Sequence, residues 1–473
     1  MKSRLKKYIG LAAALSSAFL LISCSGAEAG SDTVPIAAAA VKDADAAVLS
    51  SDTDFPAASD RLLSEAETIL SGASCDFIGH HPINENFILY VADLCGSNAI
   101  DAIVSGGNFS DPEVWYEATG KSIHVLWDGY CRATGISYYE TTRTKVLKEN
   151  KDTAKFVFTG DIGMGEGLAT TKYLDLCENG LSDCFSANLL SEMRDADVLT
   201  INNEFPYTDR GEALSGKAYT FRAHPERVEE LKDIGVDLVS IANNHVFDYG
   251  EDGILDTFDT LEKAGYPYIG AGRNIEDAAE PYSFIACGRK ITICSATQIE
   301  RATHYTQEAT ESLPGVLKTL HPERFCAEIA RAKRNADICI VFVHWGTEGN
   351  ANYGADQTAL AEAFAGAGAD AIVGGHTHCL QAVEYVDGIP CFYSLGNYWF
   401  SATGAMPDRY DTGLAEFTIG GDGIEDVSFL PCYFENGVVS ETADEGMRKP
   451  EIDRLNELSH TAVIADDGSI SQK

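Results

Sequence analysis

Several apolar runs in this chain end in residues that can bind metal ions. The run "VSIA" is followed at once by Asn243, Asn244 and His245, with Asp248 three residues further on. Similar endings are "GDIGMG", "NNEFP", "HWGTE" and "GGHTHCLQ". Imidazole nitrogens and carboxylate oxygens suit Mn, Fe or Zn. A carboxylate shared between two such ions can hold them about 3.5–4 Å apart, where they polarise a phosphoryl or carbonyl oxygen and activate water.

Each of these endings also has a purely structural interpretation. Asp161 alone is typical of a turn, His344 alone is typical of a buried core histidine, and the asparagines at 243 and 244 can cap a helix. A metal centre explains all of them together, because every candidate directly follows an apolar run. These candidates are Asp161, Glu204, Asn244, His344, His376 and His378. The two histidines of "HTH" are two apart, so on an extended chain they point the same way.

The elements that position these residues are predicted to be buried strands alternating with helices. The strand-like runs include "AKFVFTG", "ADVLTI", "VDLVSIA", "DICIVFVHW" and "ADAIVGG". Between them, "HPERVEELKDIG", "EDGILDTFDTLEKAG" and "DQTALAEAFAGAG" have polar starts, helical apolar spacing and glycine stops. This alternation predicts an α/β domain. Ligands of open α/β sheets lie at the carboxyl ends of strands, where the candidates are found.

The ordered motifs "GDIGMG", "NNEFP", "ANNHVFDYG", "HWGTE", "GGHTHCLQ" and "YSLGNYWF" resemble those of the CapA family of poly-γ-glutamate capsule synthesis proteins. The resemblance runs from about residue 155 to 420. It implies a calcineurin-like metallophosphoesterase fold, which is a sandwich of two mixed sheets flanked by helices. We assign this domain to residues 154–435, preceded by a smaller N-terminal segment of unknown fold at residues 55–150.

The resemblance also implies roles for the site residues. Asp161 would bind a first metal, Glu204 would bridge, and Asn244 would bind a second metal, with the histidines completing both sites. His245 would contact substrate and protonate a leaving group. The ligand set implied is Asp161, Glu204, Asn244, His344, His376 and His378, and the cofactors expected are two divalent ions of Mn, Fe or Zn.

Three further residues complete the expected site. Asp248 either orients His245 or caps the following helix. Arg222 and Asn243 are expected to bind substrate, because a guanidinium pairs with carboxylate or phosphate through two hydrogen bonds. The sequence departs from the family pattern at Thr377, where proline is usual. It also lacks the histidine that broader metallophosphoesterases carry two residues after Asp161. A site with one ion, or with none, is therefore an alternative.

The N-terminus has the layout of a secretory signal peptide. Basic residues precede an apolar run that ends in "LISC". This resembles a bacterial lipoprotein box and predicts a signal peptide at 1–23 with lipidation of Cys24. The alternative is an uncleaved anchor, although the run is short for a spanning helix. Either interpretation tethers the protein outside the cytoplasmic membrane, with residues 24–54 as a flexible stalk.

Composition excludes one class of partner. The formal net charge of −37 argues against nucleic-acid binding, which needs a basic surface. Twelve cysteines besides Cys24 permit disulfides in an exported chain, and the pair Cys177 and Cys184 can either staple a loop or stay free. Residues 436–473 are expected to be a polar C-terminal tail, and its last part, "SHTAVIADDGSISQK", is expected to fray.

Three functions are compatible with these observations. The first is a lipid-anchored, extracytoplasmic protein of the CapA type. It would act in synthesis, anchoring or export of an anionic capsule polymer such as poly-γ-glutamate through a metal-dependent hydrolase or transferase centre. The second is an exported general metallophosphoesterase. The third is a non-catalytic scaffold that binds polymer and membrane synthase subunits. Whether the chain is an enzyme stays open between them.

Overall fold

The computed structural model describes residues 85–107, 112–121, 143–147, 151–301 and 305–473, with isolated positions at 66, 68–70, 109, 123, 126 and 130. The chain divides into two compact units, residues 1–141 and 142–473. The predicted signal peptide at 1–23, the lipidation site Cys24 and the stalk at 24–54 lie outside the described residues.

The described part of the smaller unit is helical. It contains α4 (Glu85–Cys95), α5 (Ser97–Gly106) and α6 (Pro112–Thr119) around an apolar cluster. Trp115 is fully buried in this cluster, and its indole N–H donates to the Phe109 carbonyl at 3.0 Å. Among the described helices none alone has the length and apolar character to cross a membrane, although α4 and α5, bent by 118°, pass that test as a pair.

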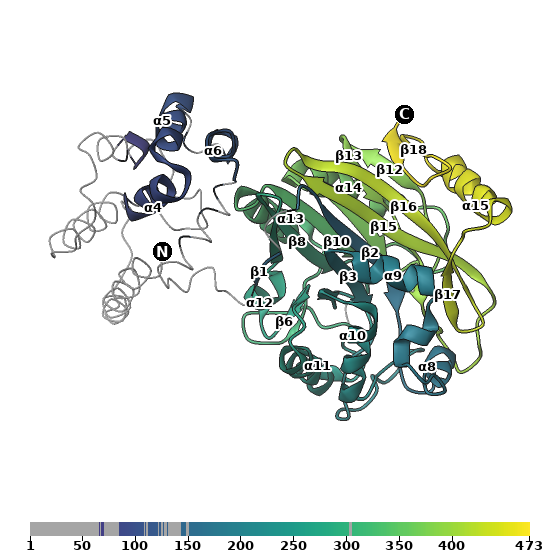
Figure 1. The fold of residues 1–473 in the computed structure, drawn as a ribbon. Coiled ribbons are helices and arrows are strands. Elements are labelled where there is room, and N and C mark those ends of the chain that lie inside the picture. The colour runs from purple at the N-terminus through teal and green to yellow at the C-terminus, as the bar shows by residue number, and fades with distance from the viewer. Residues whose placement is uncertain are drawn as a thin grey trace, which may run out of the picture. The chain divides into compact units, whose positions relative to one another are not determined.

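The larger unit is built on two mixed sheets (Figure 1). One sheet runs in the order β17 (Val438–Glu441), β16 (Gly423–Glu435), β15 (Tyr410–Gly420), β2 (Ala154–Ile162), β3 (Val198–Asn203), β4 (Leu238–Ser240) and β5 (Tyr268–Ile269), with β14 (Asn397–Trp399) paired to β2. The other runs β1 (Thr144–Val146), β7 (Tyr282–Ala286), β8 (Arg289–Thr297), β10 (Ile338–His344), β11 (Ala371–Gly375), β13 (Ile389–Phe392) and β12 (Val383–Val386). Strands β2 to β5, and β8, β10, β11 and β13, are parallel neighbours.

The core between the sheets follows from the alternation of side chains along each strand. On β2, Phe156 and Phe158 join the cluster between the sheets, whereas Val157 joins the cluster on the outer face. The Phe158 ring packs edge-on against Phe342 of β10 at 5.5 Å and Phe417 of β15 at 5.8 Å between centroids. Because both faces are covered, the central strands are apolar on both sides, which is why they read as continuous apolar runs.

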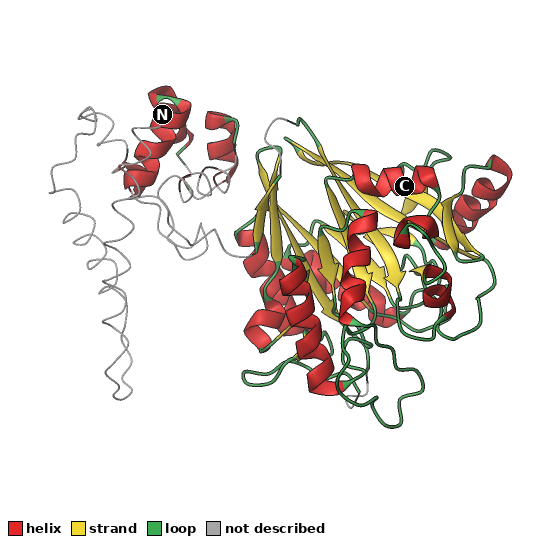
Figure 2. Ribbon diagram, turned by 60° about the horizontal axis from the view of Figure 1, so that its bottom comes forward, coloured by secondary structure: helices red, strands yellow, loops and turns green. Residues whose placement is uncertain are grey.

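Helices flank both outer faces of the sandwich (Figure 2). The β2 sheet is covered by α8 (Ala169–Leu174), η2 (Gly180–Cys184), α9 (Ala187–Asp195), η3 (Pro225–Glu230), α10 (Leu231–Ile234) and α11 (Gly250–Ala264). The β10 sheet is covered by α12 (Ile275–Ala279), α13 (Pro322–Arg334) and α14 (Ala355–Ala367). Short strands β6 (Ala271–Gly272) and β9 (Gly315–Val316) pair beside them. The predicted two-sheet sandwich with flanking helices is confirmed.

The expectation of a fraying C-terminal tail is wrong. Residues after 435 form β17, α15 (Glu445–Leu458), β18 (Ala462–Ile464) and β19 (Ile470–Gln472). Ile452 and Leu455 of α15 are buried in the cluster between the sheets. The Glu384 carboxylate on β12 accepts hydrogen bonds from the backbone N–H groups of His460 at 2.7 Å and Thr461 at 2.6 Å. The segment reads as polar because its few apolar residues are widely spaced.

The described cysteines are all free thiols, with Cys177 and Cys184 among them. Of the two alternatives for this pair, the structure therefore shows the free form. Cys294 and Cys339 lie on the neighbouring strands β8 and β10 with their sulfur atoms 3.8 Å apart, and both are buried.

Candidate metal centre

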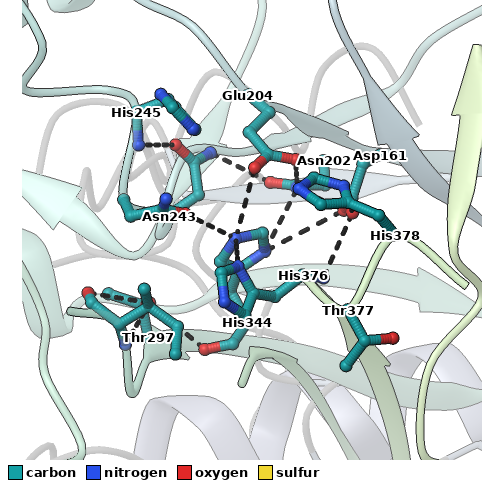
Figure 3. A network of polar contacts seen from close by, with 12 residues as sticks. Asp161, Asn202, Glu204, Asn243, His245, Thr297, His344, His376, Thr377 and His378 are labelled. Atoms are coloured by element: carbon teal, nitrogen blue, oxygen red, sulfur yellow. Dashed lines mark hydrogen bonds and ion pairs between the residues drawn. The ribbon is translucent and has the colours of Figure 1, made fainter. Parts of the chain in front are cut away.

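The predicted ligands lie where the parallel strands of both sheets end (Figure 3). Asp161 is near the end of β2, Glu204 directly follows β3, Asn244 lies in the turn after β4, and His344 is the last residue of β10. His376 directly follows β11. These five residues are at most 4% exposed, whereas the side chain of His378, the sixth predicted ligand, is 23% exposed. Two sheets from distant parts of the chain therefore deliver their polar ends to one buried place.

The ligand atoms form two groups that share one residue. Glu204, His344 and His376 offer atoms within 4.8 Å of one another, and so do Asp161, Glu204 and His378. We call these five residues the buried cluster. Glu204 belongs to both groups, which is the arrangement needed for a carboxylate that bridges two ions. The bridging position predicted for Glu204 is therefore geometrically available.

The donor atoms of the buried cluster fit a divalent ion. Glu204 Oε1 is buried and has no hydrogen-bond partner among the described residues. His344 Nε2 lies 3.5 Å from this oxygen and 3.1 Å from His376 Nδ1. Burial lowers the pKa of His344 to about 4 and that of His376 well below its usual value, so both imidazoles are neutral with a lone pair to offer. An unpartnered buried oxygen beside facing ring nitrogens is costly unless a cation joins them.

The charges in the buried cluster also favour a bound cation. Burial, and then repulsion from Glu204, raises the pKa of Asp161 to about 6. Burial also raises the pKa of Glu204. For His378, burial lowers the pKa, but Glu204, Asp161 and Asn397 together outweigh it, and the net pKa is raised. Two carboxylates in a dry site repel each other, and a divalent cation relieves that repulsion.

Two asparagines that were given no predicted role hold the ligands in place. Asn202 Nδ2 donates to Asp161 Oδ1 at 2.7 Å and lies 3.3 Å from His344 Nδ1. Asn397 Oδ1 lies 2.7 Å from His378 Nδ1. Asn202 was detectable, because it precedes Glu204 by two residues on an extended strand and therefore points to the same side.

The turn after β4 brings the side chain of Asn244 close to His344. Asn243 Oδ1 accepts hydrogen bonds from the N–H groups of His245 at 3.1 Å and Val246 at 3.0 Å, which builds the turn. Its amide also donates to Asn202 Oδ1 at 3.0 Å. Asn244 Oδ1 then lies 2.9 Å from His344 Nε2. Asn243 is thus occupied by the turn, whereas Asn244 faces the buried cluster as predicted for a ligand.

His245 is paired with Asp248. Its Nδ1 lies 2.7 Å from Asp248 Oδ2, and its ring packs against Phe221 with centroids 4.3 Å apart. Helix α11 begins after Tyr249 and has no side-chain cap, so Asp248 orients His245 and does not cap the helix. Lys217, which was given no predicted role, lies 2.6 Å from Asp248 Oδ1.

Arg222 directly follows Phe221, the aromatic residue that packs against His245. Its guanidinium lies 4.8 Å from the centre of the Tyr249 ring, and its Nε is 3.3 Å from Glu166 Oε2. The side chain is 30% exposed. The substrate-binding role predicted for Arg222 stays a prediction. The position fits it, because a partly exposed guanidinium that lies over an aromatic ring can still pair with an anion.

A second histidine–carboxylate group lies on the surface. Glu166, Asp209 and His224 also offer atoms within 4.8 Å of one another, and all three are exposed. His224 Nε2 lies 2.9 Å from Glu166 Oε1, and His224 Nδ1 contacts Asp209. We call this group the surface triad. No sequence pattern singled out these three residues.

Known proteins with similar sequences match the part of the chain that holds the site. A family model described as "Bacterial capsule synthesis protein PGA_cap" matches residues 155–402. The chain is 30% identical over 336 residues to the PGA biosynthesis protein CapA of Bacillus subtilis, covering 70% of this chain and 85% of that protein. It is 28% identical over 311 residues to the capsule biosynthesis protein CapA of Bacillus anthracis, covering 64% and 73%.

A more distant match is a probable polyglutamine synthesis accessory protein of Mycobacterium tuberculosis, which is 29% identical over 209 residues that cover 42% of this chain and 55% of that protein. The family match begins in β2 and ends just after β14, so it spans every residue of the buried cluster. The chain therefore belongs to the PGA_cap family of bacterial capsule synthesis proteins, as the motifs at its strand ends predicted.

Proposed function

We propose that this protein acts at the cell surface in the synthesis, anchoring or export of an anionic capsule polymer of the poly-γ-glutamate class. It would do so through a dinuclear metal centre. The observation that carries the proposal is the buried cluster, in which Glu204 is common to two ligand groups and has an unpartnered oxygen. The names of the two Bacillus relatives, which refer to PGA and capsule biosynthesis, support the polymer class.

The residues divide between two metal positions. Asp161, Glu204 and His378 would hold one ion, while Glu204, His344 and His376 would hold the other with Asn244 beside them. Two such ions supply electrophilic assistance to a carbonyl or phosphoryl oxygen of the substrate. The chain itself has to bring the substrate there, exclude bulk water and move a proton.

His245 is placed for the proton transfer. Its Nδ1 is held by Asp248, so Nε2 is the atom left to give a proton to a leaving group. Aromatic rings shield this position. Phe221 packs against His245, Phe400 lies 5.7 Å from Phe221, and Phe400 stacks on His378 at 5.2 Å between centroids. An apolar wall on this side strengthens the electrostatic interactions of the site by excluding water.

The remaining parts of the proposal concern attachment and recognition. A lipid on Cys24, followed by the stalk at 24–54, would hold the domain at the outer face of the membrane. There it would meet a polymer made by membrane synthase subunits. Arg222 would pair with a carboxylate of the polymer, since the protein is otherwise strongly acidic and repels such chains.

The test is a chromosomal His245→Gln substitution in the producing bacterium, with surface polymer measured by immunoassay and by chain length on gels. We expect polymer of altered length or amount, because the proton donor is lost while the turn around it is kept. The matched control is His224→Gln in the surface triad. Normal polymer in the His245→Gln strain, with the protein present at parental level, would show that the site is not catalytic.

A general metallophosphoesterase is the second candidate, and the pairing of His245 with Asp248 beside two ligand groups that share Glu204 favours it. Purified full-length protein with Mn²⁺ can be offered aryl phosphate monoesters and diesters and nucleotides. Turnover of these that is abolished by His245→Gln, together with normal polymer in the mutant strain, would replace the first proposal with the second.

A further inference from the structure

The side chain of Lys217 is largely buried although the residue lies in an irregular loop. The loop connects β3 to η3, and the side chain of Lys217 is only 7% exposed. Its Nζ lies 2.6 Å from Asp248 Oδ1, donates to the Asn244 carbonyl oxygen, and lies 3.5 Å from Glu300 Oε1. Lysine is almost never buried unless it is paired. Two of the three contacts are made to the turn that carries Asn244 and His245.

The first contact completes the partners of Asp248, which is fully buried. Its Oδ2 accepts from the Phe221 backbone N–H at 2.7 Å and lies 2.7 Å from His245 Nδ1. Its Oδ1 faces Lys217. Among the described residues Lys217 is the only lysine or arginine that pairs with Asp248. Without Lys217, only one oxygen of the buried Asp248 carboxylate has partners. Asp248 would then no longer be held in the position from which it orients His245.

The second contact reaches the predicted metal ligand. The Asn244 carbonyl oxygen accepts hydrogen bonds from Lys217 Nζ and from Thr306 Oγ1 at 3.1 Å. A carbonyl held by two donors fixes the plane of the peptide that joins Asn244 to His245. The Asn244 side chain, 2.9 Å from His344 Nε2, starts from this fixed backbone. Lys217 thus touches both the metal side and the proton-transfer side of the site.

Hydrogen bonds hold this loop in place and so position Lys217. The Leu214 N–H donates to the Asp248 carbonyl at 2.9 Å, and the Tyr305 hydroxyl donates to the Gly216 carbonyl at 2.8 Å. On the far side, the buried Lys318 donates to the Glu300 carbonyl at 3.2 Å. Glu300 thus lies between the two lysines, with its carboxylate near Lys217 and its backbone carbonyl bound by Lys318.

We propose that Lys217 is a positioning residue, which fixes Asn244 for metal binding and fixes Asp248 so that it orients His245. This inference rests on the proposed function, because it assumes that the buried cluster binds metal. It assigns a role to a residue outside the strand-end motifs. Removal of residues that orient metal ligands typically weakens metal affinity about 10- to 100-fold.

The test measures Mn²⁺ binding to the full-length protein by calorimetry, for the parent and for Lys217→Met, which keeps the length of the side chain. We expect Lys217→Met to bind at least one ion about 10-fold more weakly. The matched control is Lys333→Met. Lys333 is another partly buried lysine; it lies on α13, and its Nζ is 2.9 Å from the Asp370 carboxylate. The control should bind Mn²⁺ like the parent.

A double variant separates positioning from charge balance. If Lys217→Met is poorly folded because Asp248 is left unpaired, Asp248→Asn in the same chain removes that charge and should recover thermal stability. We expect metal affinity to stay low in the double variant, since the Asn244 carbonyl still lacks the Lys217 donor and is held by Thr306 alone. Recovery of parental Mn²⁺ affinity in the double variant would reduce Lys217 to a counter-ion and overturn the inference.

The remaining outcomes are distinguishable. A parent that binds Mn²⁺ and a Lys217→Met variant that binds it equally well would overturn this inference alone. A parent that binds no Mn²⁺ after reconstitution would overturn the proposed function, and this inference with it. Where the parent turns over an aryl phosphate, Lys217→Met should lower kcat with KM within about 2-fold, because His245 is misoriented while substrate binding is kept.

Discussion

The buried cluster and the surface triad contain the same kinds of side chain at the same spacing, yet they differ in what their atoms can still do. In each, histidine and carboxylate atoms lie within 4.8 Å of one another. In the surface triad both ring nitrogens of His224 already face carboxylates. The hydrogen bond to Asp209, and next the negative charge of Glu166, raise the pKa of His224. A protonated imidazole has no lone pair for a metal.

In the buried cluster, His378 also has a raised pKa, but the other two histidines behave in the opposite way to His224. Burial keeps His344 and His376 neutral, and Glu204 Oε1 has no hydrogen-bond donor. The difference shows that proximity of ligand types is a poor criterion for a metal site. Burial and unsatisfied lone pairs separate a site that needs a cation from one that has already neutralised itself.

The largest effect should come from removing the shared ligand. Glu204→Gln should abolish binding of both ions, because one carboxylate belongs to both ligand groups. Glu166→Gln in the surface triad should leave metal content unchanged. Plasma mass spectrometry on the purified full-length proteins measures both. Retention of one ion in Glu204→Gln would mean that Glu204 does not bridge.

A smaller effect is expected from acid. Because the pKa of Asp161 is raised to about 6, this carboxylate is protonated below that pH, and a metal ion must then displace the proton. Mn²⁺ affinity should therefore be nearly constant above pH 6.5 and fall about 10-fold for each pH unit below about 6. Calorimetric titrations between pH 5 and 8 would show this. A flat profile would remove Asp161 from the ligand set.

In the metal-free protein, Glu204→Gln is expected to have a still smaller effect, which is to stabilise the fold. The folded pKa of Glu204 is raised by burial, so its ionisation costs stability as the pH rises through that pKa. Glu204→Gln should therefore raise the free energy of unfolding at pH 8 with a chelator present, and should give no gain at pH 4, where both states are protonated. Urea unfolding at the two pH values checks this. A loss of stability at pH 8 would show that the carboxylate is structural.

The smallest effect should come from the surface triad. His224→Gln should change the free energy of unfolding by less than about 1 kcal/mol, since exposed ion pairs contribute little. Its small effect should shrink further at 1 M salt. Thermal unfolding at low and high salt measures both. A drop of several degrees that persists in salt would mean that the triad has a role its exposure does not suggest.

The apolar runs predicted an α/β domain and the common location of most candidate ligands, because buried strands must be apolar until they end, whereas the two-sheet sandwich was implied by the family resemblance. Asp161, Glu204, His344 and His376 interrupt such runs, so their common location followed from the pattern. Asn202 was missed although it lies two residues before Glu204 on the same strand face. Lys217 gave no signal, because it reaches Asp248 from an irregular loop with no periodicity to read.

The C-terminal segment was mispredicted for a related reason. Its attachment depends on hydrogen bonds from His460 and Thr461 to Glu384, more than 70 residues away. Single buried residues such as Ile452 carry the rest. Contacts of this kind leave no local pattern, so composition alone made an ordered segment resemble a tail.

The central position of β2 has a consequence for how the chain is made. β2 is hydrogen-bonded to β3 on one side and to β15 on the other, and Phe158 is paired with Ala415, more than 250 residues later. A growing chain that has not yet reached residue 410 leaves the inner strand of its sheet with an open, apolar edge. Such distant pairing slows folding, so this sheet cannot be completed until β15 has been synthesised. Chaperones that shield that edge during this delay should therefore govern the yield of the protein more than the stability of its finished fold.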